Sequence, residues 1–128
     1  MIKLLLIEDD VVCANLVKHV LQMNGFEVYI APDGLKGLRG ARDYEPDAIL
    51  LDLNLPDLDG KMVAFQLRKS PRWSEIPIIA FTGEANTKTR RLALGFGCDE
   101  MISKTEDYEE LPQQLLEIIA ARTNAKLQ

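Results

Sequence analysis

Polar side chains that could take part in chemistry stand where the aliphatic runs of this sequence end. They are Glu8, Asp9, Asp10, Asp52, Thr82 and Lys104. Asp52 stands out, because it closes the run "AILL", which has the composition of a buried segment. In an open sheet of parallel strands, ligands bind beside the carboxyl ends of the strands. If the runs are such strands, these side chains converge on one site.

Such a site would collect a large negative charge. Three carboxylates about 4 Å apart repel one another by about 4 kcal/mol per pair at an effective dielectric constant near 20. A small domain has a net stability of only about 5–15 kcal/mol, and Lys104 supplies a single positive charge. A hard divalent cation would offset the remainder, and Mg²⁺ suits a few carboxylates and waters. We therefore expect Mg²⁺ at this edge of the sheet.

The same residues suit the transfer of a phosphoryl group. The carboxylate of Asp52 is a nucleophile that can form an acyl phosphate, and it needs no general base because it is already ionised. A metal ion and Lys104 would stabilise charge on the oxygens of the transferring group, and the hydroxyl of Thr82 could donate a hydrogen bond to it.

Five short apolar runs are the expected strands, and longer amphipathic stretches separate them. The runs are Leu4–Ile7, Phe26–Ala31, Ala48–Leu51, Ile76–Phe81 and Glu100–Ser103. Three of them are almost continuously aliphatic, which is typical of strands buried on both faces. Five alternations of strand and helix predict an α/β fold, namely a doubly wound (βα)5 domain with a five-stranded parallel sheet.

Helical periodicity fills the intervals between these runs. In the first interval the apolar face consists of Val12, Leu16, Val20 and Met23. The later helices are expected over residues 35–44, after Gly60, over residues 87–94 with a stop at Gly95, and over residues 109–122. Pro112 fits the last of these helices only in its first turn.

Length, charge and cysteine content limit the class of protein. The chain has 128 residues, the usual size of one domain, and we expect a domain over residues 1–122 and a polar tail over 123–128. Its net charge of −5 argues against a broad nucleic-acid surface. Cys13 and Cys98 form neither a disulfide framework nor a CxxC metal site. The first apolar run is too short for a signal peptide or a membrane span, which predicts a cytoplasmic protein.

Four segments together resemble the receiver domain of two-component response regulators, over essentially the whole chain. They are "LLLIEDD", "PDAILLDLNLPDLDG", "IPIIAFTG" and "MISK". Their spacing also agrees with that family, since Thr82 lies 30 positions after Asp52 and Lys104 lies 52 positions after it. The resemblance implies the flavodoxin-like receiver fold and a signalling module that phosphorylation controls.

The resemblance also implies roles in the transfer itself. Asp52 would accept the phosphoryl group, and Thr82 and Lys104 would contact its oxygens. A sensor histidine kinase or a phosphotransfer protein would be the donor, and the chain would catalyse only its own phosphorylation and dephosphorylation. The phosphorylated form would bind a downstream protein through the fourth helix, fifth strand and fifth helix, with no direct contact to nucleic acid or membrane.

A metal site is implied by the same resemblance. Asp9 and Asp52 would bind Mg²⁺ directly, Glu8 would do so through water, and Asn54 would offer its backbone carbonyl. Asn54 and Glu84 would also control the approach of water to the phosphoryl group. Because an amide and a carboxylate can hold an attacking water there, we expect a short-lived phosphoprotein.

Two positions depart from the family pattern. The aromatic residue that many receivers have three positions before the lysine is Met101 here, which cannot act as a switch that combines a ring and a hydroxyl. The family commonly has a cis proline after the lysine, but this chain has Thr105. Because a cis bond before a residue other than proline costs about 3–4 kcal/mol, we expect this bond to be trans, or else cis and strained.

Other interpretations stay open at this point. A pseudo-receiver would bind partners without being phosphorylated, and a metal-dependent phosphatase would need a second acid and a cap that the sequence does not offer. The sequence does not separate a stand-alone receiver from one domain of a longer chain. Asp10 is expected to be the N-cap of the first helix, Asp57 and Asp59 loop or cap residues, and His19 a residue at the boundary of a helix face.

Overall fold

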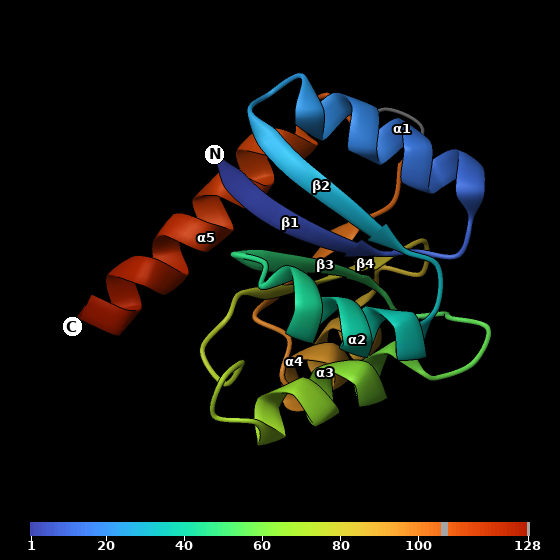
Figure 1. The fold of residues 1–128 in the computed structure, drawn as a ribbon. Coiled ribbons are helices and arrows are strands. Elements are labelled where there is room, and N and C mark those ends of the chain that lie inside the picture. The colour runs from blue at the N-terminus through green and yellow to red at the C-terminus, as the bar shows by residue number, and fades with distance from the viewer. Residues whose placement is uncertain (106–107, 128) are drawn as a thin grey trace.

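A computed structural model describes residues 1–105 and 108–127 of the chain (Figure 1). Its strands are β1 (Ile2–Ile7), β2 (Phe26–Ala31), β3 (Ala48–Asp52), β4 (Ile78–Thr82) and β5 (Glu100–Ser103). Its helices are α1 (Val11–Gln22), α2 (Gly34–Tyr44), α3 (Gly60–Lys69), α4 (Thr87–Gly95) and α5 (Leu111–Leu127). The predicted alternation of strand and helix is therefore confirmed.

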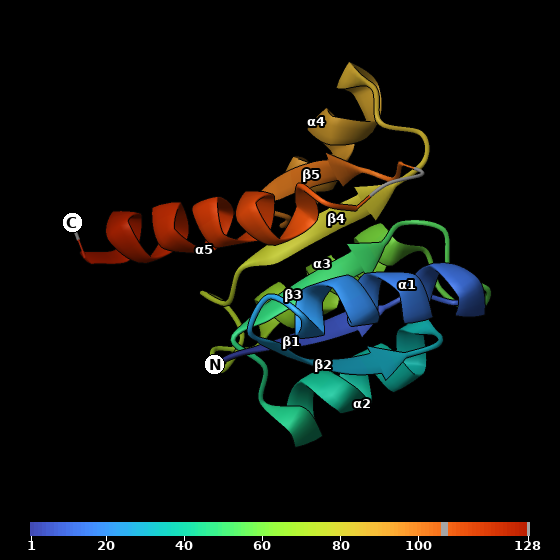
Figure 2. The same cartoon turned by 90° about the horizontal axis from the view of Figure 1, so that it is seen from above.

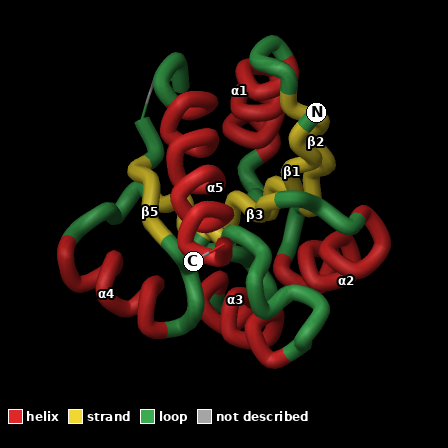
Figure 3. The backbone as a smooth tube through the Cα atoms, turned by 90° about the vertical axis from the view of Figure 1, so that its left-hand side faces the viewer, coloured by secondary structure: helices red, strands yellow, loops and turns green. Residues whose placement is uncertain are grey.

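The five strands form one parallel sheet in the order β2-β1-β3-β4-β5, as expected for a doubly wound (βα)5 fold. Helices α1 and α5 cover one face of the sheet, and α2, α3 and α4 cover the other (Figures 2 and 3). The strand order reverses between β1 and β3, because the chain first moves outward to β2 and then returns past β1. Ligand sites of such sheets lie beside the carboxyl ends of the strands at this reversal.

Strands β3 and β4 are buried along their whole length because both faces of the sheet are covered. Alternate residues point to opposite sides: Leu50 and Phe81 join the core with α1 and α5, whereas Ile49 and Ala80 join the core with α2, α3 and α4. This double burial explains why the sequence of both strands is continuously apolar rather than alternating.

The face that α1 turns to the core differs from the one that its sequence pattern predicted. Its buried residues are Ala14, Val17 and Leu21. Val12 is 77% exposed and Met23 is 73% exposed, although both belong to the predicted apolar face. The helix carries two apolar stripes, and its periodicity alone does not reveal which one packs on the sheet.

Helix ends also differ in places from their predicted positions. Helix α4 includes Gly95 and is followed by Phe96 as its C-cap, and Gly97 has the positive φ of 119° that ends the turn. Helix α5 continues to Leu127, beyond the expected end at residue 122. Pro112 is its second residue, as predicted, and the bond between Lys104 and Thr105 is trans. Within the described part of the chain, no helix combines the length and the apolarity that a bilayer span requires.

Glycines allow α2 to lie unusually close to β1. A Cβ atom on Gly37 would lie 2.6 Å from Ile7 Cδ1, and a Cβ atom on Gly40 would lie 3.2 Å from Leu5 Cδ1. Both strand side chains are fully buried and have little room to move. The glycines that dilute the helical pattern of residues 34–44 are therefore the contact surface of the helix.

Gly37→Ala should destabilise the domain by about 1–3 kcal/mol, as expected for overpacking a core. Ile7→Val, which removes the atom nearest to the new methyl group, should cost about 0.5–1.5 kcal/mol alone. The double variant should lose clearly less than the sum of the two, because the smaller side chain relieves the clash. Urea unfolding of the four proteins measures this coupling.

Gly95→Ala is the matched control, since a Cβ atom there would meet nothing within 4 Å. It should leave stability unchanged or raise it by up to about 1 kcal/mol through helix propensity. Additive losses in the double variant, or a stabilising Gly37→Ala, would show that the close contact is absent in solution.

Candidate functional site

The parallel register brings the polar residues that follow the strands to one edge of the sheet. Ile7 lies beside Leu51, so Glu8 follows β1 next to Asp52 at the end of β3. Thr82 lies beside Ser103, so Lys104 follows β5 next to the end of β4. The structure therefore gathers at this edge residues from four strand ends, as the sequence predicted.

Two carboxylates of this site are buried. Glu8 is 1% exposed and Asp52 is 3% exposed, whereas Asp9 lies at the surface. One oxygen from each of these three residues lies within 4.8 Å of the others. The hydroxyl of Thr82 is also buried beside them and accepts a hydrogen bond of 3.1 Å from the Glu84 backbone N–H.

Lys104 is the cation in contact with both buried carboxylates. Its Nζ lies 2.6 Å from Glu8 Oε1 and 3.3 Å from Asp52 Oδ2. Burial acts to lower the pKa of Lys104, but the contacts with Glu8 and Asp52 outweigh burial, so the pKa is raised. Lys104 therefore stays protonated, and one positive charge faces two buried negative ones.

The burial of the site and its excess of negative charge raise the pKa of Asp52. Burial, the adjoining Glu8 side chain and its charge raise the pKa of Asp52 to about 6, against the lowering effects of Lys104 and of the Asn54 backbone N–H. That N–H donates a hydrogen bond of 2.9 Å to Asp52 Oδ1. At neutral pH the carboxylate is mostly ionised, although its surroundings disfavour the charge.

The start of α3 keeps the backbone of Asp52 in place. The N–H of Gly60 donates to the Leu53 carbonyl at 3.0 Å, and Asn54 forms an isolated bridge with Asp59. A Cβ atom on Gly60 would lie 2.3 Å from the Asp52 carbonyl oxygen. Only glycine permits this approach, so Gly60 is part of the construction of the site and not merely the first residue of a helix.

The acidic cluster fits a small divalent cation. Glu8, Asp9 and Asp52 offer carboxylate oxygens from two neighbouring strand ends, the donor type that Mg²⁺ prefers. Glu8 Oε1 is buried and, apart from its ion pair with Lys104, has no hydrogen-bond partner among the described residues. A cation at the mouth of the cluster would compensate the charge that Lys104 leaves unbalanced.

Comparison with known proteins agrees with this geometry. The model of the family described as Response regulator receiver domain matches residues 4–116. The chain belongs to this family. It is a receiver domain of two-component systems, a class of signalling module with histidine kinases or phosphotransfer proteins as partners and an acidic site for Mg²⁺.

Two longer regulators are similar in sequence to this receiver. It is 36% identical over 85% of its length to the DNA-binding dual master transcriptional regulator RpaA of Synechocystis, and 36% identical over 91% to the cell cycle response regulator CtrA of Brucella ovis. These alignments span 45% and 50% of the two regulators, so the chain covers about half of their length.

Solved receiver structures have the same fold. Chemotaxis protein CheY4 of Vibrio cholerae superposes with a TM-score of 0.87 at 27% identity, covering 92% of this chain and 98% of CheY4. The receiver domain of sensor histidine kinase PA1611 of Pseudomonas aeruginosa has a TM-score of 0.84 at 31% identity, covering 93% and 98%. In that structure a magnesium ion is coordinated in the active site cleft.

Several acidic residues near the site of this receiver have structural roles. Asp10 and Asp59 are the N-caps of α1 and α3, as predicted. Asp57 accepts hydrogen bonds of 2.7 and 2.9 Å from the backbone N–H groups of Gly34 and Leu35 at the start of α2. These bonds lower the pKa of Asp57, and they tie the loop after Asp52 to a second helix.

Tyr108 is a neighbour of the site that the sequence did not reveal. It lies just before α5, its ring packs 5.7 Å from the ring of Phe81, and its hydroxyl is 3.6 Å from Cys13 Sγ. Met101, which replaces the usual aromatic residue of the family, packs instead on the opposite face with α2, α3 and α4. A tyrosine four positions after the lysine carries no motif, so only the packing of α5 could identify it.

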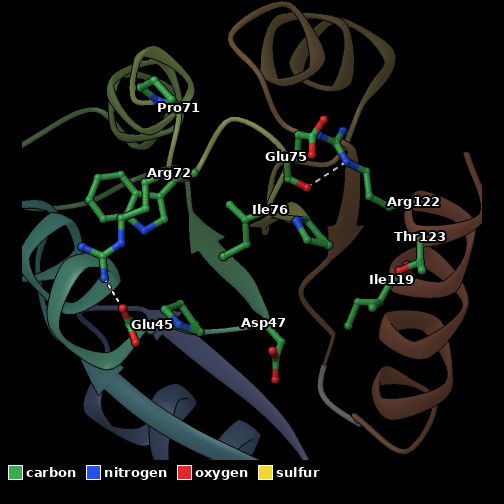
Figure 4. Close-up of a pocket in the computed structure, with 12 residues that line it drawn as sticks. Glu45, Asp47, Pro71, Arg72, Glu75, Ile76, Ile119, Arg122 and Thr123 are labelled. Carbon is green, nitrogen blue, oxygen red and sulfur yellow. Dashed lines mark hydrogen bonds and ion pairs between the residues drawn. The ribbon is translucent and has the colours of Figure 1, made fainter. Parts of the chain in front are cut away.

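A separate cavity of about 650 Å³ lies at the opposite edge of the sheet, beside the amino ends of β3 and β4 (Figure 4). Arg72 pairs with Glu45 on one side, and Arg122 donates to the Glu75 carbonyl on the other. Arg122 also pairs with Asp99. Both arginines are therefore already engaged, and none of the acidic residues of the candidate site lines this cavity.

Asp52→Asn should stabilise the metal-free protein at neutral pH. An acid whose folded pKa is raised loses stabilising free energy as pH rises from its unfolded pKa, about 3.9, toward its folded pKa. The folded pKa is about 6, so the loss is complete above that pH and is on the order of 3 kcal/mol at about 1.4 kcal/mol per unit. Asparagine carries no charge and keeps an acceptor for the Asn54 N–H.

Urea unfolding in EDTA, at neutral pH and near pH 4, measures the difference. The variant should be the more stable protein at neutral pH, and its advantage should shrink toward pH 4, where the folded wild-type carboxyl is protonated and the unfolded one is about half protonated. Asp43→Asn, at an exposed carboxylate on α2, should show no such pH dependence. A variant that is less stable than wild type at neutral pH would contradict the raised pKa.

Proposed function

We propose that this chain is a phosphorylation-controlled signalling module that accepts a phosphoryl group on Asp52. The observation that carries the proposal is the buried carboxylate of Asp52, held between Lys104 and the acidic pair Glu8 and Asp9 at the carboxyl edge of the sheet. Thr82 completes the group. A sensor histidine kinase or a phosphotransfer protein would be the donor.

Each residue of the site would have a separate role in the phosphoryl transfer. An oxygen of Asp52 attacks the phosphorus atom, a new P–O bond forms, and the P–N bond to the donor histidine breaks. The Asn54 N–H, which donates to Asp52 Oδ1, orients the nucleophile. Lys104 stabilises charge on the phosphoryl oxygens. The Thr82 hydroxyl accepts a hydrogen bond from the Glu84 N–H, and it donates its own hydrogen to one of the phosphoryl oxygens.

Glu8, Asp9, Asp52 and the backbone carbonyl of Asn54 are the residues that would hold Mg²⁺. The ion supplies positive charge to the oxygens of the transferring group when it is bound. The chain's own part is to hold the carboxylates close together in spite of their repulsion. Because phosphorylation moves charge within this crowded site, it changes which contacts of Lys104 and Thr82 are favourable.

The output would be a changed protein-binding surface on α4, β5 and α5. Arg90 of α4 pairs with Glu100 of β5 through two hydrogen bonds of 2.8 and 3.1 Å, which joins two elements of this surface. Lys88 and Arg91 are exposed on α4 and make no ion pair among the described residues. They are available to a downstream protein. The signalling output would need no direct contact with nucleic acid or membrane and no external substrate.

Incubation with acetyl phosphate and Mg²⁺ should raise the intact mass by about 80 Da, the mass of one phosphoryl group. Asp52→Asn should abolish the increase, and Asp43→Asn, at an exposed carboxylate outside the site, should retain it. A wild-type protein that gains no mass while it binds Mg²⁺ would support the alternative, a pseudo-receiver that binds partners without phosphorylation.

The phosphorylated protein should lose its phosphoryl group quickly, because Asn54 and Glu84 are both exposed and can position water at the mouth of the site. After removal of excess donor, decay is followed by intact mass. Replacing Glu84 with Ala should slow the decay, whereas Glu110→Ala, at an exposed carboxylate beside α5, should not. A wild-type phosphoprotein that persists for many hours would contradict the expected role of these residues.

A further inference from the structure

A groove between β2 and α2 has features of a ligand site and lies apart from the acidic cluster. It is a cavity of about 520 Å³, and its walls include Tyr29, Tyr44, Lys36, Arg39 and Gly40. Sites for small molecules are commonly about 300–1,000 Å³, with aromatic walls and a few polar groups that fix orientation. None of the residues proposed for phosphoryl transfer lines this groove.

One wall of the groove is an aromatic surface that its neighbours support. Tyr29 is 49% exposed on the edge strand of the sheet, and its ring lies 5.2 Å from that of Tyr44 with an interplanar angle of 31°. Tyr44 is held in turn by Lys3, whose Nζ lies 4.5 Å from the ring centroid, and by a 3.0 Å hydrogen bond from its hydroxyl to Glu27 Oε2. The exposed ring of Tyr29 therefore packs against the ring of Tyr44, which Lys3 and Glu27 hold in place.

The other wall carries positive charge that the chain does not neutralise. Lys36 and Arg39 are exposed and make no ion pair within the described ranges, 1–105 and 108–127. They lie three positions apart on α2, which places them on one face of the helix. Asp43 also borders the groove, but its carboxylate is paired with Arg42 at 3.1 Å. The side chains of Lys36 and Arg39 are therefore free to meet an anion.

Gly40 creates the space between the two walls. A Cβ atom there would lie 3.6 Å from Tyr29 Cε1, and 3.2 Å from Leu5 Cδ1 beneath it. Any larger residue would project toward the aromatic ring and fill the hollow. The groove thus has the ring of Tyr29 on one side, the backbone of Gly40 at its bottom, and the cations Lys36 and Arg39 on the other side.

We propose that this groove binds a mononucleotide. The base would stack on Tyr29, the ribose would lie over Gly40, and the phosphate would bind Lys36 and Arg39. Stacking of a base on an aromatic ring contributes about 1–3 kcal/mol and tolerates different bases. A lone anion would use the two cations but not the ring, and a nucleoside would use the ring but not the cations, so the combination favours a molecule that has both parts.

The test is a titration of the full chain with AMP and with GMP, followed by backbone NMR. Saturable shifts should appear at residues 29–31 and 36–44. Arg39→Gln and Tyr29→Ala should each weaken binding at least tenfold. Tyr29→Phe should retain binding because it keeps the ring, and Arg42→Gln should retain it because that guanidinium is engaged by Asp43 on the same helix.

Adenosine and inorganic phosphate are the matched ligands, and each should bind at least tenfold more weakly than AMP. Equal binding of inorganic phosphate would overturn the proposal and reduce the groove to a plain anion site. Equal effects of Arg39→Gln and Arg42→Gln would overturn it as well, because they would indicate a general attraction of anions to α2. No saturable shift at up to about 10 mM nucleotide, which corresponds to less than about 3 kcal/mol of binding, would also refute it.

The outcome does not depend on phosphoryl transfer at Asp52. Asp52→Asn should leave nucleotide binding unchanged, and Arg39→Gln should leave the mass increase with acetyl phosphate unchanged. Failure of either function is therefore recognised separately from failure of the other.

Discussion

The repulsion between two buried carboxylates is the interaction on which the rest of the site depends. Glu8 and Asp52 are both almost fully buried, and within the described part of the chain both pair with the same cation, Lys104. Burial without full compensation raises the pKa of Asp52. The folded protein therefore maintains a charge arrangement that is unfavourable by itself and that becomes favourable when positive charge is added.

The sheet and its helices make this arrangement possible. Parallel strands β1, β3, β4 and β5 bring their carboxyl ends to one edge, and two packed faces keep those ends rigid. Gly60 lets α3 begin directly beneath the Asp52 backbone, and Asp57 joins the same loop to the start of α2. A site with such strong internal repulsion requires this support, because a flexible loop would separate the charges instead of holding them together.

Much of this could be predicted from the sequence, because the buried strands are continuous apolar runs that end on the polar residues of the site. The predicted strands agree with the structure to within two residues at each end. The core face of α1 could not be predicted, since two apolar stripes share the helix and Ala14 and Val17 were not distinguished from the exposed Val12 and Leu16.

Contacts between side chains that are far apart in the chain also could not be predicted from the sequence. The cap that Asp57 provides to α2, the packing of Tyr108 against Phe81 and the groove beside Tyr29 depend on how helices approach the sheet. Gly37 and Gly40 show why that approach is hard to predict. In the sequence they are residues that weaken a helix, and in the structure they are the surface that brings the helix close to β1.

The most direct test of the charge imbalance is the effect of Mg²⁺ on the free energy of unfolding, compared between the wild type and Asp9→Asn. Asp9 is exposed at the mouth of the cluster, so its replacement should leave the fold intact. We predict that Mg²⁺ stabilises the wild type with the concentration dependence of one bound ion and has a much smaller effect on the variant. A wild-type protein whose stability does not respond to Mg²⁺ would contradict the account.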